Sequence, residues 1–200
     1  QVQRLAHRLA ETSEIMADAL VSSDFRRAVE TAELLRDSLG GSATFDEFER
    51  LAGFGEHDPG PEIDGMTFET YVQLFGTPDW SGDPDLEIFP GGETTAQFHR
   101  RVDGAFDELL ARHGGYCIVL VSHGGVIDAL LRKLLGTAMT GVFESHTLNT
   151  SITEFVGPMT SRGIWRLVRY NDAAHLAGLP AATNPTDPPE QIIQDKLAEA

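Results

Sequence analysis

Two adjacent arginines follow a short apolar run and begin a segment with helical spacing. The run ends at Val21, and residues 22–24 (Ser-Ser-Asp) are of the types that start helices. Arg26 and Arg27 then oppose the helix dipole in its first turn. An anion bound between the guanidinium groups and the helix terminus would remove that conflict. The same residues are equally consistent with two solvated arginines in weak surface ion pairs.

A histidine follows a second apolar run, which ends at Val121. His123 is succeeded by Gly124 and Gly125, and glycines let a ligand approach the backbone closely. Histidine is the commonest acid–base side chain near neutral pH, so this segment suits contact with a small oxyanion. A structural histidine at the end of a strand would leave the same pattern, and both interpretations stay open on this segment alone.

Alternating strands and helices must position the two junctions. Apolar spacing predicts helices over 1–19, 25–39, 93–112 and 126–135, and strands over 19–21, 43–48, 116–121, 152–156 and 164–170. The continuous run 116–121 is typical of a central parallel strand buried on both faces. The order predicts an α/β fold, a three-layer α/β/α sandwich with a mostly parallel central sheet. Because ligands bind beyond the carboxyl ends of such strands, Arg27 and His123 are expected to share one pocket.

The composition limits the classes of partner. The chain has 200 residues, enough for one domain with a substantial core, and its apolar runs are too short to span a bilayer. A net charge of −16 argues against nucleic acid. Residues 41–99 hold 13 acidic residues and one cation, Arg50, so an anionic ligand must bind in a local pocket. The single cysteine and the lack of a visible signal peptide favour the cytoplasm.

Two segments lie outside the predicted layers. Residues 53–92 are rich in Gly, Pro and Asp and are expected to form an acidic cap inserted over the core, with a short helix near 68–75. Loops of this kind carry specificity. Residues 181–200 have prolines at positions 185, 188 and 189 and are expected to be a surface-wrapped or mobile tail. The domain is therefore predicted to span residues 1–180.

Five segments, in order, resemble the histidine phosphatase superfamily, the phosphoglycerate mutase-like proteins. They are 20–32 (LVSSDFRRAVETA), 91–102 (beginning GGET), 121–127 (VSHGGVI), 149–154 (NTSITE) and 170–176 (YNDAAHL). The family pattern places its arginine at Arg27 and leaves Arg26 at a variable position. The resemblance implies a phosphoglycerate mutase-like fold with His123 as the second catalytic histidine.

The sequence departs from the family pattern in two places. The R-H-G motif, which carries the nucleophilic histidine on the family's first strand, is not found ahead of segment 20–32, and the letters R-H-G occur only at 112–114, at the end of the helix predicted over 93–112. The expected explanation is a truncated sequence in which the domain lacks its first strand, and a natural pseudoenzyme is the alternative. The family's general acid is a glutamate after the second strand. Glu47 is the nearest match, with Glu49 and Glu56 as alternatives.

The resemblance implies a metal-independent phosphatase that hydrolyses a small phosphomonoester through a phosphohistidine. Arg27, His123 and Gly124 would bind the phosphate, and Glu47 would protonate the leaving oxygen. No cofactor, metal, nucleic acid or membrane partner is expected, only a small phosphorylated substrate. A phosphoglycerate-type mutase and a non-catalytic phosphate-binding protein are the alternatives. The sequence leaves the substrate and the oligomeric state open.

Overall fold

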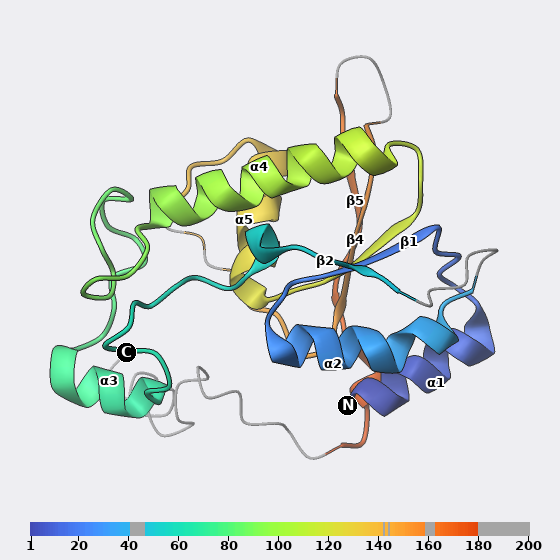
Figure 1. The fold of residues 1–200 in the computed structure, drawn as a ribbon, viewed down its shortest axis with the longest axis horizontal. Helices are drawn as coiled ribbons and strands as arrows, with labels where there is room; N and C mark the ends of the chain where they lie inside the picture. Colours follow the sequence, from blue (N-terminus) through green and yellow to red (C-terminus); the bar gives the residue numbers. More distant parts are fainter. Residues whose placement is uncertain (41–46, 142, 144, 159–162, 180–200) are drawn as a thin grey trace, which may run out of the picture.

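The computed structural model describes residues 1–40, 47–141, 143, 145–158 and 163–179 (Figure 1). Its helices are α1 (Val2–Thr12), α2 (Arg26–Leu35), α3 (Phe68–Phe75), α4 (Thr95–His113) and α5 (Gly124–Leu135). Its strands are β1 (Ala19–Ser22), β2 (Glu49–Arg50), β3 (Ile118–Val121), β4 (Ile152–Val156) and β5 (Arg166–Asp172). The predicted α/β fold is confirmed, since helices pack on a parallel sheet.

The sheet has the order β2-β1-β3, and both pairings are parallel. Strands β4 and β5 form a separate antiparallel ladder. The prediction that residues 116–121 form a central strand is wrong. Within the described residues β3 pairs only with β1, and its side chains are half-buried, whereas those of β1 are buried. A continuous apolar run indicates burial, but it does not report how many strands lie beside it.

Helices cover both faces of this sheet, and each face has its own apolar cluster. In Figure 1, α4 and α5 lie on one side of the strands, and α1 and α2 lie on the other. Val21 of β1 packs toward α4 and α5 with Val102 and Val126. Val121 of β3 packs toward α1 and α2, near Leu35. Because β1 and β3 are neighbouring parallel strands, with Ser22 opposite Val121, the junctions that follow these two strands lie side by side.

The largest differences from the predicted bounds occur in two elements, the first helix and the second strand. The helix predicted over residues 1–19 ends at Thr12, because Ser13 adopts a left-handed conformation (φ 50°) and donates its backbone N–H to the carbonyl of Leu9. The strand predicted over 43–48 is found at Glu49–Arg50, and residues 41–46 lie outside the described part of the chain.

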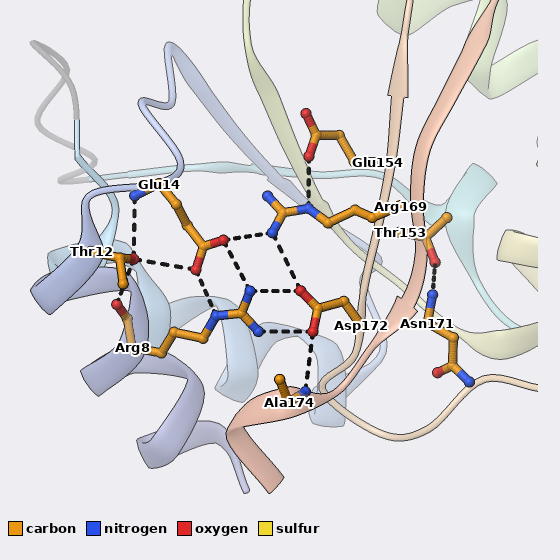
Figure 2. Close-up of polar contacts among 9 residues, drawn as sticks. All are labelled: Arg8, Thr12, Glu14, Thr153, Glu154, Arg169, Asn171, Asp172 and Ala174. Atoms are coloured by element: carbon orange, nitrogen blue, oxygen red, sulfur yellow. Dashed lines mark hydrogen bonds and ion pairs between the residues drawn. The ribbon is translucent and has the colours of Figure 1, made fainter. Parts of the chain in front are cut away.

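An ion-pair network joins α1 to the β4–β5 ladder (Figure 2). Arg8 of α1 contacts Glu14 and Asp172, with nitrogen–oxygen distances of 2.6 Å to each. Arg169 of β5 contacts Glu14 at 2.6 Å and Glu154 of β4 at 2.7 Å. The network holds α1, the segment after it and the ladder in one arrangement.

The segment predicted as a cap contains the expected helix, α3, at Phe68–Phe75. Ile63, Tyr71 and Phe89 form an apolar cluster of its own. The predicted tail, residues 181–200, lies outside the described residues, so the domain bounds stay a prediction. In the part of the chain that the structure describes, no helix has both the length and the apolar character to cross a membrane.

Candidate active site

The turn after β1 is built by two serines that are fully buried, Ser22 and Ser23. The hydroxyl of Ser22 donates to the carbonyl of Ser23 at 2.7 Å. The hydroxyl oxygen of Ser23 accepts the backbone N–H of Phe25 at 3.1 Å. These bonds satisfy buried polar groups and direct the chain from the end of β1 into α2. They also explain why polar residues follow the apolar run directly.

His123 lies at the corresponding point after β3, as the residue that caps α5. Its Nε2 is 2.8 Å from the hydroxyl oxygen of Ser23, and its ring contacts the ring of Phe25 edge to face at 5.1 Å. Burial lowers the pKa of His123 to about 4, and the positive charges of Arg27 and Arg101 add to this effect. The imidazole is therefore neutral near pH 7.

A neutral imidazole has one N–H, on Nε2 or on Nδ1. The Ser23 hydroxyl can accept from Nε2–H or donate its own proton to Nε2, because the bond from the Phe25 N–H uses only one of its lone pairs. In the second arrangement the N–H lies on Nδ1, which makes no hydrogen bond with another described residue, and it offers a donor to an anion at the ends of β1 and β3.

The two arginines of α2 differ in their surroundings. Arg26 is exposed and pairs with Glu30 at 2.6 Å, one turn along the helix. The Arg27 guanidinium lies 4.9 Å from the centre of the Phe25 ring, and it has no ion pair within the described residues. Phe25 thus contacts both Arg27 and His123, so the structure brings these two predicted site residues to one place.

The three candidate glutamates lie in different places. Glu47 is exposed and precedes β2, at the opposite end of the sheet from His123. Glu49 contacts His113 at 2.6 Å, near the end of α4. The Glu56 carboxylate accepts the backbone N–H of Gly125 at 3.2 Å. Only Glu56 therefore reaches the turn that carries His123, and Glu47 does not.

Gly125 leaves the space that the Glu56 carboxylate occupies. A Cβ atom at this position would lie 2.2 Å from Oε1 of Glu56 and 3.3 Å from the ring of Phe98. A second bond, from the backbone N–H of His57 to Oε1 at 3.0 Å, orients the same carboxylate. The first turn of α5 thus already accommodates an anionic group, as helix N-termini do.

Metal ligands were not predicted from the sequence. Among the described residues, no group of three or more His, Cys, Asp or Glu side chains could hold a metal ion.

The sequence matches a family model described as histidine phosphatase superfamily (branch 1), over residues 1–173. A Hydrogenobacter thermophilus protein named putative phosphoserine phosphatase 2 is 30% identical over 137 residues, which cover 68% of this chain and 65% of that protein. Phosphoglycerate mutase-like protein 4 of Arabidopsis thaliana is 30% identical over 179 residues, which cover 88% of this chain and 73% of that protein.

Solved structures share the fold at lower identity. A mycobacterial glucosyl-3-phosphoglycerate phosphatase with bound VO3 has a TM-score of 0.68 and 24% identity, and the match covers 86% of this chain and 84% of that one. A phosphoglycerate mutase from Bacillus anthracis has a TM-score of 0.62 and 21% identity, with coverages of 88% and 82%. The fold is therefore phosphoglycerate mutase-like.

Proposed function

The chain belongs to the histidine phosphatase superfamily, and on this premise we propose that it acts in the hydrolysis of a small phosphomonoester. The phosphoryl group is transferred in two steps. It passes first from the substrate to a histidine, and then from the phosphohistidine to water. A relative and a structural neighbour named as phosphatases support hydrolysis as the outcome.

The observation that carries the proposal is the convergence of Arg27 and His123 on Phe25, beyond the carboxyl ends of β1 and β3. An arginine without an ion pair in the described structure can bind two phosphate oxygens with its planar fork. His123 donates a further hydrogen bond, and Gly124 allows the phosphate to approach the first turn of α5. Each such donor stabilises the charge that develops during phosphoryl transfer.

Glu56 is assigned the role of general acid in this proposal, in place of Glu47. Its carboxyl group lies at Gly125, two residues beyond His123, where it can reach the leaving oxygen of a bound phosphomonoester. The same group takes a proton from the water that attacks the phosphohistidine. Glu47 has no role in this proposal, since it precedes β2 and lies at the opposite end of the sheet from His123.

The nucleophilic histidine is not assigned to any of these 200 residues, because the one R-H-G segment, 112–114, ends α4, where His113 contacts Glu49 and does not follow a strand as the family's nucleophile does. The proposed site is the part that binds phosphate and protonates the leaving group. A mutase would use the same groups and return the phosphoryl group to a substrate hydroxyl instead of water.

The test is hydrolysis of p-nitrophenyl phosphate by the protein as its gene encodes it, with and without EDTA. We expect turnover that EDTA does not reduce and that His123→Ala reduces by at least ~100-fold. Release of free phosphate separates a phosphatase from a mutase. Absence of turnover, together with retained orthovanadate binding, would instead support a non-catalytic phosphate-binding protein.

A further inference from the structure

Arg101 of α4 grips the loop that carries Glu56. Its Nη1 donates to the carbonyls of Gly53 and Gly55, each at 3.1 Å, and its Nη2 donates to the carbonyl of Glu56 at 3.2 Å. The guanidinium also binds Glu93 with two bonds, of 2.9 and 2.7 Å. One half-buried side chain therefore ties residues 53–56 to α4.

Close packing fixes the same loop against α4. A Cβ atom at Gly53 would lie 2.5 Å from the Cβ of Ala105, so the loop backbone rests on the helix. The guanidinium of Arg101 lies 5.2 Å from the ring centre of Phe98, which also borders Gly125. Arg101, a residue of α4, thus contacts both the loop that carries Glu56 and the ring of Phe98, which lies beside Gly125.

From this geometry we infer that Arg101 is a positioning residue, which holds the Glu56 carboxyl group at the first turn of α5 and so controls its transfer of a proton to the leaving oxygen. The inference rests on the proposed function, because it assigns Arg101 an effect through Glu56. Arg101 touches no reacting atom. The Arg101 guanidinium forms an ion pair with Glu93. Arg27 is therefore the arginine that is proposed to bind the phosphate.

The contacts require arginine and not a cation alone. The guanidinium has five N–H donors in one plane, and here they are divided between a carboxylate and several carbonyls. Lysine has a single ammonium group on a flexible chain and cannot span these partners. Arg101→Lys is therefore expected to behave like Arg101→Gln.

The experiment compares two aryl esters that differ in their need for an acid. The leaving group of phenyl phosphate is phenoxide, a strong base whose departure needs protonation by an acid. The p-nitrophenoxide that leaves p-nitrophenyl phosphate is a weaker base and needs protonation less. The measured quantity is the ratio of kcat/KM for p-nitrophenyl phosphate to kcat/KM for phenyl phosphate. This ratio does not depend on the folded fraction of a sample, so loss of stability in a variant does not alter it.

We expect Glu56→Gln and Arg101→Gln each to raise this ratio by at least ~10-fold. Arg100→Gln is the matched control, because Arg100 is the exposed neighbour on α4, and it should leave the ratio unchanged. The double variant of Glu56 and Arg101 should have the ratio of Glu56→Gln alone, because the two residues act as one unit.

The outcomes separate the two proposals. An unchanged ratio in Glu56→Gln would remove Glu56 as the acid, and the role of Arg101 would fall with it. A raised ratio in Glu56→Gln with an unchanged ratio in Arg101→Gln would overturn only the positioning role. A double variant in which the two effects multiply would show that Arg101 acts independently of Glu56 and would also overturn the inference.

Discussion

The imidazole of His123 and the hydroxyl of Ser23 lie 2.8 Å apart, although 100 positions separate them in the sequence. Ser23 directly follows β1, His123 follows β3 after one residue, and the two parallel strands are neighbours with Ser22 opposite Val121. The contact therefore results from sheet register, which brings the two strand ends to the same level. It links His123, the proposed phosphate-binding histidine, to the turn that begins α2.

Ser23→Ala is expected to disturb His123 more than Ser22→Ala. Removal of the Ser23 hydroxyl leaves Nε2 of His123 and the N–H of Phe25 without this partner, at a cost of ~1–3 kcal/mol. Ser22 is equally buried, but among the described residues its hydroxyl bonds only the carbonyl of Ser23. Orthovanadate affinity and the ring-nitrogen NMR signals of His123 measure the difference. Equal changes in the two variants would mean that Ser23 does not select the tautomer.

Gly125→Ala should damage the site, whereas Gly104→Ala should not. The new methyl group at position 125 would overlap the Glu56 carboxylate at 2.2 Å, so the Glu56 side chain must move. We expect ~1–3 kcal/mol of destabilisation and a selective loss of phenyl phosphate hydrolysis. Gly104 lies within α4 with no atom near its missing Cβ, and alanine there should add ~0.5–1 kcal/mol of stability. Urea unfolding measures the stability of both variants. The ratio of kcat/KM for p-nitrophenyl phosphate to kcat/KM for phenyl phosphate measures the effect on the site.

The residues at strand-to-helix junctions could be predicted from the sequence because their signals are local. Ser23, Arg27 and His123 each follow an apolar run within a few positions, and such a change in polarity is visible without a structure. The ion pair between Arg26 and Glu30 likewise follows from helical spacing. Local signals do not say which strands are neighbours, and β3 was therefore given the central place that β1 occupies.

The proposed general acid, Glu56, could not be singled out in this way. Glu56 lies in a loop whose path is determined by Arg101, 45 positions away, and by the contact of Gly53 with Ala105. No local pattern distinguishes Glu56 from Glu47, and only tertiary packing does. The helix predicted over 1–19 failed for a related reason: Ile15 continues the apolar spacing, but it packs against the cluster from outside the helix.

The network around Arg8 and Glu14 predicts how stability responds to acid. The hydrogen bond from Arg8 lowers the pKa of Glu14 to about 2, and that of Asp172 well below its usual range. A carboxylate with a lowered pKa stabilises the fold above its unfolded pKa of about 4. This contribution is lost as the pH falls through the folded value.

Arg8→Gln should therefore destabilise the protein near neutral pH, by ~1 kcal/mol at most because the pairs are partly exposed. The difference from the wild type should shrink as the pH falls from about 4 toward about 2, since Glu14 becomes protonated over this range, and Asp172 follows only at lower pH. Arg36→Gln is the control, because its partner Asp37 is an exposed neighbour. Urea unfolding across this range is the measurement, and a constant difference would contradict the assignment.

Arg27→Ala is expected to weaken anion binding more than Arg26→Ala, although the residues are adjacent. Successive helical residues point about 100° apart, so one small pocket does not receive both side chains. Arg26 is directed to Glu30, and Arg27 lies over Phe25 beside His123. A charge-assisted hydrogen bond contributes ~1.5–3 kcal/mol, whereas an exposed pair such as Arg26–Glu30 contributes ~0.2–1 kcal/mol.

Orthovanadate affinity should therefore fall by at least ~10-fold in Arg27→Ala and by less than ~5-fold in Arg26→Ala. A second measurement is independent of any ligand. After burial, the charge of Arg27 is the largest cause of the lowered pKa of His123, so Arg27→Ala should raise that pKa in an NMR titration. Arg26→Ala should leave it where it is, because Arg26 is not among the charges that act on His123. Equal losses of affinity, or a raised His123 pKa in Arg26→Ala, would show that Arg26 and not Arg27 faces the site.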